Sequence, residues 1–99
     1  MNREALMVIA LAYKAGKLLS GEVQVLEGVR SGNVCLMVVS EDASSNAKKR
    51  FTDKCRYYGV EWIECGSKRE TASMIRKEEL SAIAFTDEGF KQLFLKKLK

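Results

Sequence analysis

The stretch from Val34 to Tyr58 limits the possible folds more than any other part of this sequence. It opens with six consecutive apolar residues, VCLMVV, a run that is too short for a comfortable helix and rich in β-branched side chains. Such a run predicts a strand buried on both faces, which needs one layer of structure above it and another below it. The next segment, Ser44 to Gly59, predicts a helix, because small polar residues that can cap a helix come first and a glycine ends it. The apolar stripe of this helix consists of Ala47, Phe51, Cys55 and Tyr58.

Glycines and apolar spacing divide the rest of the chain into short elements of alternating type. We predict helices over residues 2–15, 22–31, 67–76 and from 87 onward, and extended segments over 17–20, 60–65 and 80–85. The helix at 67–76 starts with Ser67 and Glu70 in the spacing of a capping box. The inward stripes are predicted to be Leu6, Ile9, Ala10 and Tyr13 in the first helix, Val25, Leu26 and Val29 in the second, and Phe90, Leu93 and Phe94 in the last. This order predicts an α/β protein with a single domain over residues 1–99, a three-layer α/β/α sandwich around a small mixed four-stranded sheet.

One glycine, Gly28, falls inside the predicted helix at 22–31. A glycine in a helix interior costs up to ~1 kcal/mol relative to alanine. Either another segment packs closely against this position, or the helix is locally weak.

The composition argues against most catalytic and membrane functions. The chain has no histidine and only three irregularly spaced cysteines, so we predict small buried thiols, no metal site and no cofactor. No apolar run approaches the ~20 residues that a membrane span needs, and we find no signal peptide, so we expect a cytoplasmic protein without membrane contact. Glu41 and Asp42 follow the central strand, where they either face a ligand or stabilise the start of the next helix. We predict that the protein is not an enzyme, and its net charge of +4 is compatible with a nucleic-acid partner.

Several motifs resemble those of one known family. The segment EDASSNAKKRFTDKCRYYGV, residues 41–60, is similar to the strand-to-helix segment of the kink-turn-binding ribosomal protein superfamily, the L7Ae and L30e group. The motifs AGK, SGE and RSG upstream and FTDEGF downstream look most like the short bacterial YlxQ-type members, so that the resemblance covers nearly the whole chain. It implies the same α/β/α sandwich, and it implies an RNA-binding protein that recognises structured, kink-turn-like RNA in a ribosome- or translation-related setting.

The resemblance also places an RNA-binding site at the start of the helix that is entered through Gly21. The family pattern there is Gly-Thr-Asn-Glu-x-x-Lys, and in this chain Glu22 replaces the threonine, Val23 the asparagine, Gln24 the glutamate and Glu27 the lysine. Gln24 can still donate and accept hydrogen bonds at a base edge, whereas Val23 removes a polar contact. Glu27 exchanges a phosphate-attracting charge for a repelling one, a change on the order of 1–3 kcal/mol.

Three basic residues are predicted to lie at the same end of the sheet as this helix start, namely Lys17, Lys68 and Arg69. They either form a phosphate-contacting rim around Gly21 and Gln24 or remain ordinary solvated side chains.

Two hypotheses of different kinds follow. In the first, the chain is an RNA-binding module that contacts structured RNA through residues 21–27 and 66–69. In the second, it is a protein-interaction module that has lost kink-turn recognition, and the face that bears Val23 docks onto a ribosomal or translation-related protein. We expect a monomer in either case.

Overall fold

The computed structural model describes all residues, 1–99, and every predicted helix and strand is present in it. The elements are α1 (Arg3–Lys14), β1 (Leu18–Ser20), α2 (Glu22–Arg30), β2 (Leu36–Val39), α3 (Ser45–Tyr58), β3 (Trp62–Glu64), α4 (Lys68–Ser73), β4 (Ala82–Phe85) and α5 (Glu88–Lys97). The largest difference from prediction is at α4, which ends before residue 76, because Arg76 adopts a left-handed φ of 59° that no helix can continue through. None of the helices is both long and apolar enough to cross a bilayer.

The four strands form one mixed sheet in the order β1-β4-β2-β3. β4 runs antiparallel to both of its neighbours, β1 and β2, while β2 and β3 are parallel. β1, β2 and β3 are therefore parallel to one another, and their last residues all lie at the same end of the sheet, which we call its carboxyl end. The loops that lead into α2, α3 and α4 all start at this end.

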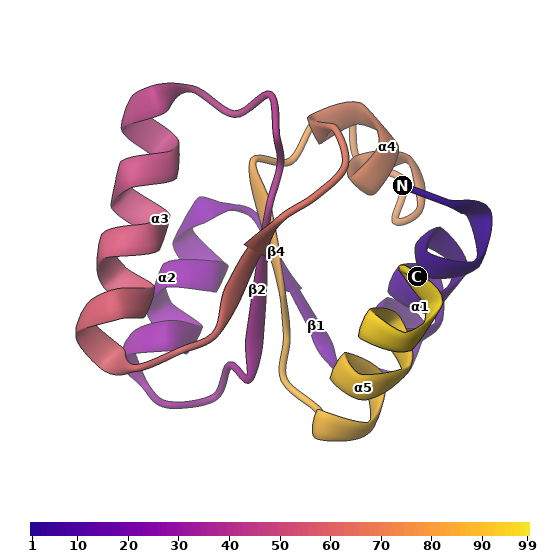
Figure 1. Cartoon of the computed structure of the whole chain (residues 1–99), viewed down its shortest axis with the longest axis horizontal. Helices are drawn as coiled ribbons and strands as arrows, with labels where there is room; N and C mark the ends of the chain where they lie inside the picture. Colours follow the sequence, from indigo (N-terminus) through magenta and orange to yellow (C-terminus); the bar gives the residue numbers. More distant parts are fainter.

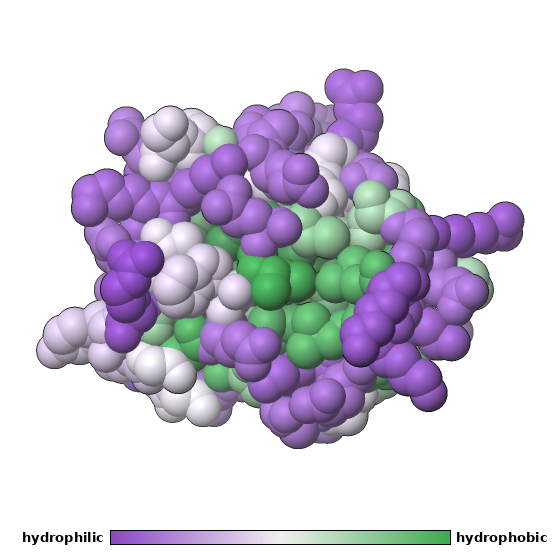
Figure 2. Space-filling view, viewed as in Figure 1, coloured by the Kyte–Doolittle hydropathy of each residue, from purple (hydrophilic) through white to green (hydrophobic).

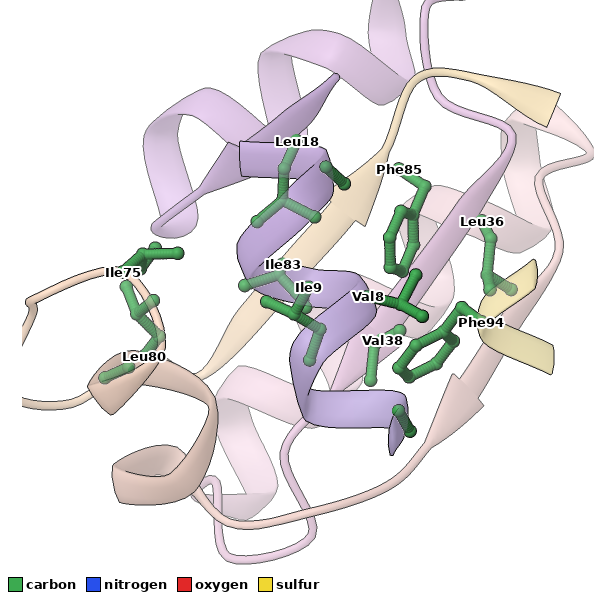
Figure 3. Close-up of a cluster of buried hydrophobic side chains, with 13 residues drawn as sticks. Val8, Ile9, Leu18, Leu36, Val38, Ile75, Leu80, Ile83, Phe85 and Phe94 are labelled. Carbon is green, nitrogen blue, oxygen red and sulfur yellow. The ribbon is translucent and has the colours of Figure 1, made fainter. Parts of the chain in front are cut away.

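The helices cover both faces of the sheet, which confirms the predicted α/β/α sandwich. α2 and α3 pack on one face, and α1, α4 and α5 pack on the other (Figure 1). Successive residues of a strand point to opposite faces, so Leu36 and Val38 of β2 join the α1 and α5 side while Met37 and Val39 join the α2 and α3 side. On the first side, Val8 and Ile9 of α1 and Phe94 of α5 meet these strand residues in one apolar cluster (Figure 3).

The predicted apolar stripe of α1 is wrong by about one residue. The structure buries Ala5, Val8, Ile9 and Ala12, and of the four predicted residues only Ile9 is buried, while Tyr13 is 42% exposed. The reason is that α1 carries apolar side chains around most of its circumference, so spacing alone allowed several stripes. Packing on the sheet and on α5 selected the stripe with two alanines, which permits close approach.

Two further stripes are partly corrected. In α3, Ala47, Phe51 and Cys55 are buried as predicted, but Tyr58 lies outside the core. In α5 only Phe94 is fully buried, and Phe90 and Leu93 are half-buried at its margin. The α2 stripe is confirmed, with Val25 and Val29 buried and Leu26 half-buried.

The glycine at position 28 allows close packing and does not mark a weak point of the helix. A Cβ atom at this position would overlap Leu19 Cδ1 and lie 3.0 Å from Val34 Cγ2, so these side-chain ends would have to shift. The missing side chain thus lets α2 sit tightly against β1 and the segment before β2.

Hydrophobic atoms reach the surface along the middle of one face of the molecule. In the view of Figure 1 they lie where β3 borders the layer of α5, with mainly hydrophilic atoms around them (Figure 2). β3 is an edge strand, and Ile63 and the following Cys65 are only half-buried there. Gly21 follows β1, the strand at the opposite edge, so this apolar surface is not part of the α2 start.

Candidate nucleic-acid interface

The start of α2 is an uncapped helix end. Gly21 is the N-cap residue and has φ 86° and ψ 156°, a conformation essentially restricted to glycine. No side chain accepts a hydrogen bond from the first turn, so its backbone N–H groups, which have no acceptor within the helix, are left for water or a ligand. Backbone donors and the positive end of the helix dipole together favour an anion at this place.

The side chains around this helix start are largely held in place. Gln24 accepts a hydrogen bond from the backbone N–H of Ser20 through Oε1 at 3.3 Å, which leaves its NH₂ group free to donate outward. Glu22 accepts two hydrogen bonds from the Arg50 guanidinium, at 2.8 and 3.0 Å, and is thereby tied to α3. Val23 is 83% exposed, the largest exposure of any bulky apolar residue in the chain. The outer face of α2 thus offers a polar donor beside an apolar side chain.

Glu27, at the position where the resemblance expects a lysine, forms an ion pair on its own helix. Its Oε1 accepts a hydrogen bond from Nη2 of Arg30 at 2.6 Å, and both side chains are 60% exposed. The pair has no net charge, so the carboxylate repels a nearby phosphate less than it would alone. The spacing of Glu27 and Arg30 on one helix could have predicted this pair. Nothing in the sequence indicates that Glu22 meets Arg50, which lies 28 positions away.

The loop between β3 and α4 is rigidly held in comparison. Ser67 and Glu70 form the predicted capping box, with Ser67 Oγ accepting from the Glu70 N–H and Glu70 Oε1 accepting from the Ser67 N–H. Glu41 Oε1 accepts from the Gly66 N–H at 3.1 Å, and Asp42 Oδ1 accepts from the Lys68 N–H at 2.8 Å. The two carboxylates that follow β2 therefore fix this loop. Asp42 lies at the start of α4, and the start of α3 is capped by Ser44 instead.

The predicted basic residues do not all gather at the carboxyl end. Lys17 precedes β1, and its carbonyl oxygen accepts from the Thr86 N–H after β4, so it lies at the opposite end of the sheet from Gly21. The expectation that Lys17 borders Gly21 is wrong, because β1 runs its full length between them. Lys68 and Arg69 do lie at the carboxyl end, and β3 is three strand spacings from β1, or roughly 14 Å. Lys68 Nζ also contacts Glu79 at 3.5 Å, while Arg69 is exposed and in no salt bridge.

The three thiols are poor candidates for nucleophiles. Burial raises the pKa of Cys55 to about 11 and also raises the pKa values of Cys35 and Cys65. A raised pKa keeps a thiol in its neutral, weakly reactive form near pH 7. No group of three or more His, Cys, Asp or Glu side chains is placed to hold a metal ion.

Known proteins similar to this chain have related folds and sequences. The proteins named RNA-binding protein YlxQ from Bacillus subtilis (strain 168) and Enterococcus faecium are 40% and 36% identical to it, over 84% and 90% of this chain and 83% and 85% of their own lengths. A solved structure of a protein with unknown function from Bacillus halodurans C superposes with a TM-score of 0.88 at 33% identity, covering 96% of each chain. The Giardia lamblia 15.5kD RNA binding protein shares the fold, with a TM-score of 0.78 at 16% identity over 97% of this chain and 86% of its own. Residues 3–95, nearly the whole chain, match the ribosomal protein L7Ae/L30e/S12e/Gadd45 family, and the chain belongs to this family.

Proposed function

We propose that this protein binds structured RNA of the kink-turn type through the start of α2, in a ribosome- or translation-related setting in the cytoplasm. Family membership and the names of the two YlxQ relatives support RNA as the ligand. The observation that carries the location is the uncapped helix start at Gly21, whose free N–H groups and glycine-only backbone suit close approach by a phosphate.

The neighbouring side chains have separate tasks in this proposal. The free NH₂ group of Gln24 donates to a base edge, while its Oε1 stays bonded to Ser20 and keeps the amide oriented. Lys68 and Arg69 supply positive charge at the same end of the sheet, beyond the helix start. Val23 contacts the sugar or the face of a base, since it has no polar group to offer.

The decisive residue for testing this site is Glu27. Glu27→Lys removes the carboxylate and places a cation where the family pattern has one, so we expect kink-turn affinity to rise by about five-fold or more. Glu88→Lys is the matched control, because Glu88 also pairs with a cation three positions along its helix and is similarly exposed, but belongs to the other helix layer. Both variants change the net charge equally, so a general electrostatic effect would raise affinity in both.

The measurement is a titration of labelled kink-turn RNA and of a plain duplex of equal length, at low magnesium and at two salt concentrations. The wild-type protein is expected to prefer the kink-turn RNA, and its affinity should fall steeply with salt. Equal binding of the two RNAs, unchanged by Glu27→Lys, would remove kink-turn recognition from the proposal.

A second candidate function rests on the exposure of Val23. An apolar side chain that is 83% exposed on the face expected to meet RNA also suits docking on a ribosomal or translation-related protein. A pull-down from lysate with and without nuclease separates the two functions. Partners that vanish with nuclease treatment support RNA, and partners that persist support a protein interface.

A further inference from the structure

A groove lies between α2 and α3, away from the uncapped start of α2. It has a volume of about 640 Å³ and is lined by Leu26, Arg50, Asp53, Lys54, Tyr57 and Tyr58. The two helices run side by side in the same direction on one face of the sheet, remote from α1, α4 and α5 (Figure 1). Arg50 lines the groove and is paired there with Glu22 of the α2 start.

The aromatic side chains at the other end of the groove have no role in the core. Tyr57 is 82% exposed and Tyr58 41% exposed, and neither belongs to a buried cluster. Their rings meet edge to face, with centroids 4.9 Å apart and planes at 78°, so each restrains the other while the face of Tyr57 stays open to solvent. Single exposed apolar residues need no explanation, but two adjacent rings beside Leu26 form a patch that folding does not account for.

One unpaired cation of α3 favours an anion in this groove. The helix carries five basic residues and one acid, Asp53, but Arg50 is paired with Glu22 and Lys48 with Glu64. Asp53 is already paired with Lys49 at 2.9 Å and Arg56 at 3.5 Å, so it contributes little repulsion. Lys54 is in no salt bridge and lies in the groove beside the tyrosines.

We propose that this groove binds single-stranded nucleotides that flank the RNA held at the α2 start, with a base stacked on Tyr57 and a backbone phosphate near Lys54. Open aromatic faces and adjacent cations are the features with which proteins hold single strands, and a base inside a duplex has no free face to stack. The occupant follows from proximity, since the groove meets α2 at Leu26, five residues or about 8 Å along the helix axis from Gly21. The proposal rests on the proposed function in that it takes RNA as the ligand.

The test uses four RNA probes: a blunt kink-turn hairpin, the same hairpin with a five-uridine extension at its 5′ end, the same hairpin with that extension at its 3′ end, and a free ten-uridine strand. The wild-type protein is expected to bind one extended hairpin about five-fold or more tighter than the blunt one, the gain of stacking a base. Tyr57→Ala should abolish that gain and weaken binding of the free strand, without changing affinity for the blunt hairpin. Tyr57→Phe, which keeps the ring, should retain both.

Tyr13→Ala is the matched control, because Tyr13 is an exposed tyrosine on α1 in the opposite helix layer. If Tyr57→Ala lowers neither the extension gain nor free-strand binding more than Tyr13→Ala does, the groove is not a single-strand site. A blunt hairpin that binds no better than the plain duplex of the kink-turn titration, together with Tyr57-dependent binding of the free strand, would remove only the kink-turn proposal. A protein that binds none of the four probes would remove both.

Discussion

The helices α2 and α4 begin in similar surroundings, but the backbone N–H groups of their first turns differ in whether they have hydrogen-bond acceptors. Each helix follows a strand at the carboxyl end of the sheet, and each is entered near a glycine with positive φ, Gly21 or Gly66. The first turn of α4 receives a complete capping box, and two carboxylates from another loop accept the N–H groups of Gly66 and Lys68. The first turn of α2 receives no side-chain cap at all. The backbone of the α4 start therefore has few hydrogen-bond donors left for a ligand, whereas that of the α2 start keeps its donors available.

The largest effect is expected from Gly21→Ala at the open start. A Cβ atom there meets nothing within 4 Å, so the whole penalty is backbone strain, about 1–3 kcal/mol. Thermal unfolding should show a Tm lower by about 4–8 °C for each kcal/mol. Gly66→Ala is the companion variant, since its φ of 75° is equally strained for alanine and should also destabilise, while weakening RNA binding less than Gly21→Ala does. A Gly21→Ala protein with unchanged Tm and RNA binding would contradict a conformational requirement at the open start.

A smaller effect is expected from Ser67→Ala at the α4 start. This change removes the oxygen that accepts the Glu70 N–H and should cost about 1 kcal/mol, the usual value of an N-cap. Urea unfolding measures the loss as a lower midpoint with the same slope. Affinity for RNA should stay unchanged. If affinity falls as much as for Gly21→Ala, the contrast between the two helix starts does not hold for ligand binding.

The smallest effect on stability is expected from Val23→Asn at the open start. Val23 is exposed and packs on nothing, so the free energy of unfolding should change by less than about 0.5 kcal/mol. The new amide can bond a base edge, and we expect kink-turn affinity to rise a few-fold, as for one added hydrogen bond. Leu11→Asn, at a 52% exposed apolar position on α1, controls for general loss of apolar surface. Equal RNA binding by both variants would argue that Val23 faces a protein partner instead.

The order of elements, the capping box and the double burial of β2 could all be predicted from the sequence. These features depend on residues that are a few positions apart in the sequence, so the spacing of residue types predicts them. The face of α1 that enters the core could not be predicted, because its apolar side chains surround the helix and only contact with α5 and the sheet selects among them. The position of Lys17 was mistaken because both ends of a three-residue strand lie near Gly21 in sequence, although the strand separates them in space. The ion pair of Glu22 with Arg50 joins two helices, so the residue pattern of neither helix alone predicts it.

The close packing at Gly28 also affects the start of α2, although Gly28 lies further along the same helix. Because a Cβ atom at position 28 would overlap the end of the Leu19 side chain and crowd that of Val34, a larger residue requires these side chains or α2 itself to shift. We expect Gly28→Ala to weaken RNA binding even though position 28 is buried and offers no group to a ligand. Titration of kink-turn RNA measures this effect. Unchanged affinity would mean that the added methyl group is accommodated locally, without a shift of α2. The absence of a side chain at position 28 thus helps to set the distance between the sheet and α2, whose first turn carries the free backbone donors.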